Sequence, residues 1–261
     1  MSKQNWNFSR RNLLLGALNG VGLLALSGCE KVFNSLSRNE TVGNILASAE
    51  SGNRRVQRFL ASRNKLAQEF SEKDISAKFR SNGNPPPITV EYATDAAKQF
   101  SDWRLEVTGL VKQPGSFSLA DLKSLPSRTQ ITRHDCVEGW SAIAKWKGVR
   151  VEEIVNKVQP APEAKYMLIR CLDSDSDGAN YYESIDLVDA VHPQTILAYE
   201  MNDKPLPVAN GAPLRLRVEN QLGYKQAKYI KSLEFVASFN KIASGKGGYW
   251  EDQGYEWYAG I

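Results

Sequence analysis

The pattern of hydrophobic and polar residues predicts many strands and few, short helices. Hydrophobic and polar residues alternate over residues 103–107, which indicates a half-buried strand. The apolar run at 166–172 predicts a buried strand. Further strands are expected at 129–135, 196–199, 214–218 and 229–236, and a helix at 151–158. Because strands dominate and the helices are short, we predict an α+β fold with mixed β-sheets.

Two short helices carry recognisable start signals. Ser118 and Asp121 have the spacing of a capping box for a helix over residues 119–124. Ser184 is expected to cap a second helix over residues 185–191. Both helices are short enough to act as connections between strands.

The N-terminal residues have the features of an export signal. An apolar run at residues 13–26 follows the pair Arg10 and Arg11, and it is short for a membrane span. The arginine pair resembles a twin-arginine export signal, and residues 26–29 (Leu-Ser-Gly-Cys) resemble a lipobox. We therefore expect a signal at 1–28, lipidation of Cys29, and a lipid-anchored protein on the periplasmic side of a bacterial inner membrane. An uncleaved amphipathic anchor is the alternative interpretation.

Two further regions follow the signal. Apolar residues recur at roughly helical spacing through residues 29–84, among many polar residues, which predicts a helical extension or spacer. Residues 82–87 (Asn-Gly-Asn-Pro-Pro-Pro) end it as a stiff loop. The remaining residues, 85–261, are expected to form the main domain.

Charge and cysteine content narrow the function. The formal net charge of the 261 residues is +4, but residues 1–28 contain Lys3, Arg10 and Arg11 and no acidic residue, so the rest carries +1. That balance argues against a general nucleic-acid-binding protein. Besides Cys29, the chain contains Cys136 and Cys171, and a disulfide between them is a competing structural interpretation.

Reactive side chains are concentrated at residues 133–140 (Arg-His-Asp-Cys-Val-Glu-Gly-Trp). A thiol beside titratable groups suits a redox metal or a reactive cysteine, whereas an isolated Cys is more often buried and inert. A cysteine protease or zinc site is disfavoured, because neighbours on a strand point to opposite faces and the chain has only two His. His134 is expected either near a cofactor or as a hydrogen-bonded loop histidine.

Several motifs in order give a specific resemblance. Residues 136–140 (Cys-Val-Glu-Gly-Trp), together with downstream motifs, closely resemble the sulfite oxidase family of molybdopterin enzymes. The similarity is nearest to the bacterial, signal-bearing branch that includes periplasmic methionine-sulfoxide reductase catalytic subunits. The downstream motifs lie at residues 181–186, 192–202, 210–218, 222–229 and 248–257.

The resemblance implies an Mo-molybdopterin cofactor and roles for particular residues. The thiolate of Cys136 would bind molybdenum, and Cys171 would lie near the pterin. Glu138 would transfer protons or make a structural hydrogen bond, and Tyr181 would approach the substrate oxygen, with Tyr182 as its rival. The pterin and its phosphate would be held by Asn210, Arg215, Lys225 and Lys228.

Three sequence features are expected to contribute less. Arg217 is expected on a solvated strand face. Residues 88–93 stand where better-known members carry a pterin-binding loop with an Asn, and they contain no Asn. The motif at 173–178 (Asp-Ser-Asp-Ser-Asp-Gly) copies half of a calcium-binding loop but lacks its final Glu, so we expect an acidic surface turn.

The same resemblance bears on the reaction. Sulfite oxidases carry an Arg five residues after the metal-binding Cys and another well upstream; here those positions hold Ser141 and the neighbourhood of Thr89. A dianion needs fixed cations in a desolvated pocket. We therefore expect reduction of neutral S-oxides or N-oxides by oxygen-atom transfer, with methionine sulfoxide as the leading candidate. Sulfite oxidation, with Lys145 or Lys147 replacing the missing Arg, and a non-enzymatic lipoprotein binding module are the alternatives.

Electrons must be exchanged with another protein. The chain has no Cys-x-x-Cys-His haem motif. A membrane haem protein or a quinone-linked subunit is the expected electron-transfer partner. Export in the folded state would suit a protein that receives its cofactor in the cytoplasm.

Overall fold

The structure is a computed structural model that describes residues 65–81 and 83–261, together with Gly52 and Arg55. Arg54–Ile261 cluster into one compact unit. The predicted signal, Cys29 and most of the predicted helical extension lie outside the described residues. The elements are η1 (Glu72–Asp74), α4 (Val90–Ala97), β1 (Arg104–Gly109), β2 (Gly115–Ser118), α5 (Leu119–Ser124), β3 (Ser127–Cys136), β4 (Trp140–Arg150), α6 (Val151–Val158), β5 (Tyr166–Ser174), β6 (Asn180–Asp186), α7 (Leu187–Ala190), β7 (Ile196–Met201), β8 (Lys204–Pro205), η2 (Val208–Asn210), β9 (Arg215–Arg217), η3 (Gly223–Lys225), β10 (Ile230–Val236) and α8 (Tyr249–Asp252).

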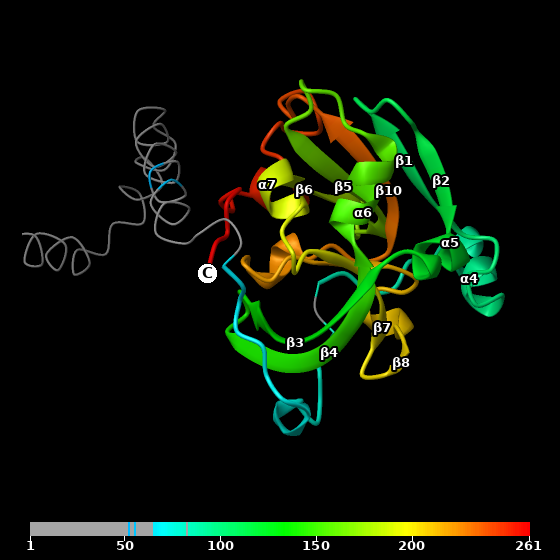
Figure 1. Ribbon diagram of the computed structural model, residues 1–261, viewed down its shortest axis with the longest axis vertical. Coiled ribbons are helices and arrows are strands. Elements are labelled where there is room, and N and C mark those ends of the chain that lie inside the picture. The colour runs from blue at the N-terminus through cyan, green and yellow to red at the C-terminus, as the bar shows by residue number, and fades with distance from the viewer. Residues whose placement is uncertain (1–51, 53–54, 56–64, 82) are drawn as a thin grey trace, which may run out of the picture. The chain divides into compact units, whose positions relative to one another are not determined.

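Two β-sheets organise the unit (Figure 1). One has five strands in the order β2-β1-β10-β5-β6, and the other has the order β3-β4-β7-β8, with β9 paired to β7. β1 and β10 are parallel, whereas the other strand pairs are antiparallel. Helices are short throughout the described chain, so the predicted α+β class with mixed sheets is confirmed.

The main hydrophobic core contains residues from both sheets and from the short helices. Alternate residues of β1 and β10 are buried on one face, as the period of a strand requires. α6 adds three buried residues at helical spacing to the same core. Representative members are Leu105, Val107, Leu122, Val151, Ile154, Met167, Ile169, Leu197, Leu216, Leu233 and Phe235. The core fixes the ends of β5, β6 and β9, from which functional side chains project.

Helix starts were predicted with mixed success. The capping box of Ser118 and Asp121 is present at the start of α5, as predicted. The helix expected over residues 185–191 is shorter: α7 begins after Asp186, whose carboxylate accepts hydrogen bonds from the Val188 and Asp189 amides. The prediction that Ser184 caps it is wrong, because pairing with β5 keeps β6 extended as far as Asp186. Tertiary pairing outweighs the local capping preference here.

The segment before α4 lies along the second sheet. Residues 65–81 contain one 3-10 turn and are otherwise extended or irregular. The Phe70 amide donates to the Ile131 carbonyl oxygen (2.9 Å), and the Phe79 ring packs edge-on against Trp146 with 5.3 Å between ring centroids. This packing delivers Asn84 to the pocket described below.

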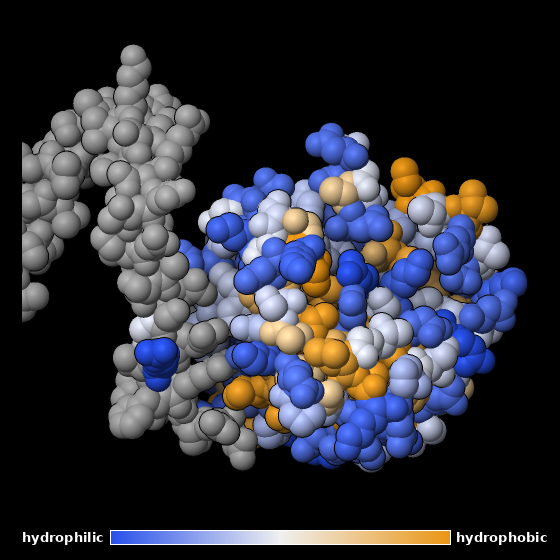
Figure 2. All heavy atoms as spheres, turned by 90° about the horizontal axis from the view of Figure 1, so that it is seen from above, coloured by the Kyte–Doolittle hydropathy of each residue, from blue (hydrophilic) through white to orange (hydrophobic). Residues whose placement is uncertain are grey.

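The surface is mostly hydrophilic. In the face drawn in Figure 2, hydrophilic residues predominate and hydrophobic residues gather in a few places. Among the described large hydrophobic side chains, Ile88 and Val90 are the most exposed, at 96% and 83%. Within the described residues, no helix has the length and apolar character needed to span a membrane.

Candidate active site

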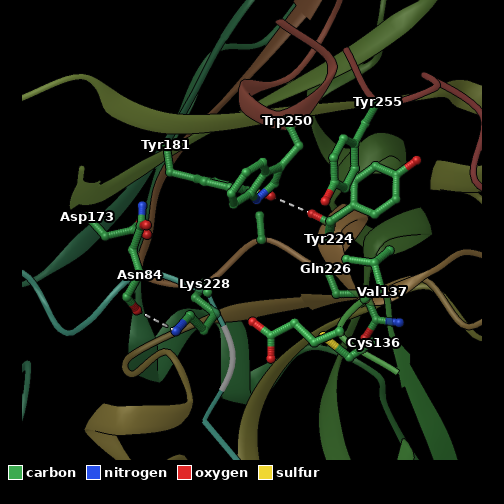
Figure 3. Close-up of a pocket in the computed structure, with 14 residues that line it drawn as sticks. Asn84, Cys136, Val137, Asp173, Tyr181, Tyr224, Gln226, Lys228, Trp250 and Tyr255 are labelled. Carbon is green, nitrogen blue, oxygen red and sulfur yellow. Dashed lines mark hydrogen bonds between the residues drawn. The ribbon is translucent and has the colours of Figure 1, made fainter. Parts of the chain in front are cut away.

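A pocket of about 100 Å³ collects side chains from six segments. Figure 3 shows Tyr181, Tyr224, Trp250 and Tyr255 along one side and Cys136 and Val137 on the other. Asn84, Asp173 and Lys228 close one end of the pocket (Figure 3). The pocket therefore combines an aromatic wall, a thiol and a polar end.

Cys136 occupies the last position of β3, where the chain turns into β4. The turn is closed by the Gly139 amide, which donates to the Cys136 carbonyl oxygen (3.1 Å), and Gly139 has φ +82°, which favours glycine. The thiol is half-buried and lines the pocket. Burial raises the pKa of the Cys136 thiol, so metal binding would have to displace its proton. A free thiol in this position is suited to a soft metal ion.

The cysteines form no disulfide with each other. Cys136 and Cys171 are both free thiols, so the competing disulfide interpretation is wrong. Cys171 is buried on β5 and does not line the pocket. Burial, followed by Asp173 and Glu183, raises the pKa of Cys171, which keeps it a neutral thiol.

Two predicted catalytic residues line the pocket, in different environments. Glu138 is exposed rather than buried, and its Oε2 accepts a hydrogen bond from Trp140 Nε1 (2.9 Å). Tyr181 is buried, and its hydroxyl donates to the Tyr224 carbonyl oxygen. Burial, followed by the charges of Glu183 and Glu251, raises the pKa of Tyr181, so its phenol remains protonated. The rival Tyr182 donates instead to Asp252 Oδ2 (2.5 Å) and is not among the pocket residues.

Arg215 stands at the centre of a group of buried donors beside the pocket. Its Nη1 donates to the Asn210 carbonyl oxygen (3.2 Å), while its Nε and Nη2 have no hydrogen-bond partner in the described chain. The same is true, within those residues, of Asn210 Nδ2, His134 Nε2 and the Tyr229 hydroxyl. Native proteins rarely leave so many buried polar atoms unpaired. These donors fit an anionic, acceptor-rich cofactor such as a pterin phosphate.

Lys228 connects this donor group with the pocket. Its ammonium donates to the Asn84 carbonyl oxygen (2.8 Å) and lies 5.0 Å from the Tyr229 ring centroid. Burial and the nearby Arg215 lower the pKa of Lys228 to about 8. Lys228 and Arg215 are therefore two cations near each other in a buried environment, and a bound anion would offset the free-energy cost of burying both charges.

The structure separates two predicted residues from the pocket. The ammonium of Lys225, predicted to hold the cofactor, donates to Glu183 and Glu251, and Lys225 is not a pocket residue. Arg217 was expected on a solvated strand face, which is wrong: it is fully buried and forms a two-point ion pair with Glu219. β9 pairs with β7 and lies inside the molecule, so both of its faces are covered.

His134 is buried on β3. Its Nδ1 lies 3.2 Å from Arg217 Nη1 and 3.3 Å from Gln226 Oε1. Burial, followed by Arg215 and Arg217, lowers the pKa of His134, so its ring is neutral at neutral pH. His134 lies on a strand rather than in a loop, and its Nε2 has no hydrogen-bond partner among the described residues, while its place beside a cofactor stays a prediction.

Asn84 and Asp173 are among the pocket residues to which sequence reasoning assigned no role in the site. Asn84 stands in the loop before α4, whereas residues 88–93, where a cofactor-binding loop was sought, include the N-terminal turns of that helix. Asp173 opens the motif predicted as an acidic surface turn, yet it is 2% exposed. Burial raises the pKa of Asp173 to about 6. Within the described residues, no group of three or more His, Cys, Asp and Glu side chains could hold a metal ion.

Comparison with known proteins defines the class. Residues 92–241 match the family described as oxidoreductase molybdopterin binding domain, so the chain belongs to this family. The protein is thus a molybdopterin-binding oxidoreductase of the sulfite oxidase type, as its motifs indicated. When bound, molybdenum in this cofactor supplies two-electron oxygen-atom transfer, and the thiol of Cys136 and the unpaired donors around Arg215 fit it.

Particular relatives are methionine-sulfoxide reductase subunits. YedZ1 of Azospira oryzae, named for a subunit of a protein-methionine-sulfoxide reductase, is 37% identical over 97% of this chain and 86% of its own. The catalytic subunit MsrP of Xanthomonas axonopodis is 36% identical over 59% of this chain, which spans 53% of that relative. Among solved structures, the sulfane dehydrogenase SoxCD of Paracoccus pantotrophus matches with 21% identity and a TM-score of 0.47, over 53% of this chain and 39% of its own.

Proposed function

We propose that the protein reduces neutral S-oxides, with methionine sulfoxide, free or in proteins, as the leading substrate, and N-oxides as chemically related ones. The charge of the pocket carries this proposal. Among the described residues that line it, Lys228 is the single cation, and Glu138 and Asp173 are acidic. A dianion would be poorly held there, whereas a neutral oxide beside an aromatic wall needs no counter-charge. The names of the relatives YedZ1 and MsrP support the same substrate class.

The cations suggested as replacements for the missing arginine are engaged elsewhere. Lys145 forms ion pairs with Glu72 and Asp203, and Lys147 forms one with Glu200. Ser141, at the position of the first missing Arg, donates its hydroxyl hydrogen bond to Asp135 Oδ1. None of the three is among the pocket residues of the described chain.

The predicted site residues would then have distinct parts in oxide reduction. The reaction R₂SO + 2 H⁺ + 2 e⁻ gives R₂S and H₂O, so the sulfur–oxygen bond breaks and two protons are consumed. Cys136 would hold the metal, and Arg215, Asn210 and Lys228 the cofactor phosphate. The protonated Tyr181 phenol would orient the oxide oxygen by exchanging its hydrogen bond to the Tyr224 carbonyl for one to the substrate. Glu138 at the rim has access to solvent for proton exchange.

One observation favours sulfite oxidation as a second candidate. The guanidinium of Arg80 lies 5.6 Å from the Trp140 ring centroid, and its charge reaches the Cys136 thiol. Arg80 is exposed and is not a pocket residue. Arg80 nevertheless lies close in sequence to the pocket residue Asn84, in the described segment before α4.

An assay of both reactions separates the two candidates. The purified holoprotein should reduce methionine sulfoxide with a reduced viologen dye as electron donor, and should oxidise sulfite at most slowly with an artificial acceptor. Arg80→Gln should leave sulfoxide reduction within about threefold of the wild type, since exposed charges contribute little. Efficient sulfite turnover that collapses in Arg80→Gln, together with no sulfoxide reduction, would establish the second candidate instead.

We further propose an exported protein anchored by lipid on Cys29, on the periplasmic side of the inner membrane. The lipobox at 26–29 supports the anchor, and two acyl chains suffice for stable attachment. Electrons would come from a membrane haem or quinone-linked partner, in keeping with the subunit status in the names of the relatives.

Replacement of Cys29 tests the anchor. Cys29→Ala should leave the exported protein in the soluble periplasmic fraction, and the wild-type protein should carry a lipid mass detectable by mass spectrometry. The control replaces both Arg10 and Arg11 with Lys. This change should block export itself, so it distinguishes a failure of export from a loss of the lipid anchor. A Cys29→Ala protein that is exported and still membrane-bound would contradict the proposal.

A further inference from the structure

A buried cluster of one lysine and two glutamates lies directly behind the pocket. The ammonium of Lys225 donates to Glu183 Oε1 and to Glu251 Oε1, the latter at 2.5 Å. All three side chains are at most 1% exposed. The Trp257 ring covers the ammonium, with 5.3 Å between Nζ and the ring centroid. The cluster is thus closed to bulk water.

The position of the cluster follows from three elements that also line the pocket. Lys225 stands on η3 between the pocket residues Tyr224 and Gln226. Glu251 follows the pocket residue Trp250 on α8, and Glu183 lies two residues after Tyr181 on β6. A change of charge in the cluster therefore acts immediately behind the aromatic wall.

The charges of the cluster do not balance. Lys225 is the one cation with which either carboxylate forms an ion pair in the described chain. The Oε2 atoms of both Glu183 and Glu251 have no hydrogen-bond partner among the described residues. Two ionised carboxylates only accept hydrogen bonds, so they cannot satisfy each other. A second negative charge without a partner is costly in such a place.

The surrounding groups do not supply the missing positive charge. Among the described residues, Cys171 on β5 and Tyr181 and Tyr182 on β6 are titratable groups whose pKa values burial and the cluster raise, so all three are neutral. Gly248 packs so closely that a methyl group on it would lie 2.0 Å from Glu251 Oε2 and 2.8 Å from Glu183 Oε1. The two carboxyl groups therefore converge beside a glycine, with no space for another cation at that point.

We propose that Glu183 and Glu251, which both accept hydrogen bonds from Lys225, hold one proton between them. We propose further that this pair of carboxyl groups is a proton store for the reaction in the adjoining pocket. Burial, followed by the charge of Glu251, raises the pKa of Glu183, in agreement with a retained proton. The role as a store rests on the proposed oxide reduction, which consumes two protons for each oxygen released as water. The pair would supply one proton and the solvent the other, while a membrane haem or quinone-linked protein supplies the electrons.

The shared proton has a direct spectroscopic test. Infrared spectra of the holoprotein at about pH 8, where ordinary carboxyl groups and Asp173 are ionised, should show the carbonyl stretch of a protonated carboxylic acid that shifts in D₂O. Glu183→Gln and Glu251→Gln should each remove this band, because each leaves a balanced Lys–Glu pair. Glu251→Asp should keep it. Glu234→Gln, which changes a surface ion pair with Arg170, is the matched control and should also keep it.

Stability and turnover give the second readout. Because the pKa of Glu183 is raised, the free energy of unfolding of the wild type should fall as the pH rises from the ordinary pKa of Glu through the raised value. Neither Gln variant should show this fall. With sulfoxide and a reduced viologen, Glu251→Gln should lower kcat about tenfold with KM unchanged, and Glu251→Asp should restore most of it. If both Gln variants turned over at the wild-type rate, the carboxyl pair would not be a proton store for the reaction.

The two proposals fail separately. Absence of the infrared band from the wild type overturns the shared proton, whatever the activity. If the wild type shows the band but reduces no S-oxide, the proposed function fails and with it the store, while the shared proton stands.

Discussion

Replacing Cys136 with Ser should abolish turnover and remove bound molybdenum while leaving the fold intact. The side chain is half-buried at the end of β3, and the two residues differ by one atom, so the change in unfolding free energy should stay near 1 kcal/mol. A hydroxyl is a hard and poorly ionised replacement for a thiolate on a soft metal. The loss of activity should exceed about a hundredfold, the upper range for changes that merely surround a metal ligand.

Cys171 provides the matched control. It is the other described cysteine, it is buried, and it does not line the pocket. Cys171→Ser should therefore retain molybdenum, even if a buried hydroxyl lowers the melting temperature. Metal analysis of protein from a molybdenum-replete host, with thermal unfolding in parallel, measures both effects. Full turnover of Cys136→Ser would rule out the ligand role, and a wild-type protein that binds no molybdenum would favour the binding-module alternative.

The two arginines of β9 should respond to replacement in opposite ways. Arg215 has two unpaired guanidinium nitrogens in the described chain, and burial followed by Arg217 lowers its pKa to about 9. Arg215→Met should therefore leave the cofactor-free protein as stable as the wild type or more so. Loss of the charged hydrogen bonds should weaken cofactor binding by about 3 kcal/mol, roughly a hundredfold.

Arg217 is the control two residues away on the same strand. Its Nη2 donates to Glu219 Oε2 (2.6 Å) and its Nε to Glu219 Oε1 (2.8 Å), with both side chains at most 1% exposed. Arg217→Met leaves the Glu219 charge buried without its partner and should cost about 3–5 kcal/mol. Denaturant unfolding of cofactor-free protein and pterin content of the purified protein measure the two effects. Equal destabilisation by both variants, with unchanged pterin content, would make Arg215 a purely structural residue.

The sequence by itself determined most of the elements and the residue proposed to bind the metal. Strands such as β1 and β10 bury alternate residues, and α5 begins at its capping box. The spacing of residues along the chain therefore predicted both kinds of element correctly. Cys136 was found because its motif is contiguous in the chain. The family assignment likewise rests on motifs that can be read in order.

The tertiary structure decided which side chains meet. Arg217 and Lys225 are two cations in motifs that indicated cofactor binding, yet each is paired with buried acidic residues that do not line the pocket. Asn84 and Asp173 reach the pocket from segments that sequence analysis assigned to a spacer and a surface turn. The physical reason is that periodicity tells which face of an element is apolar, whereas burial on both faces and the pairing of charges depend on elements far apart in the chain. The sequence therefore determined the elements and the chemistry available, and packing alone decided whether each charge faces the pocket or a buried partner.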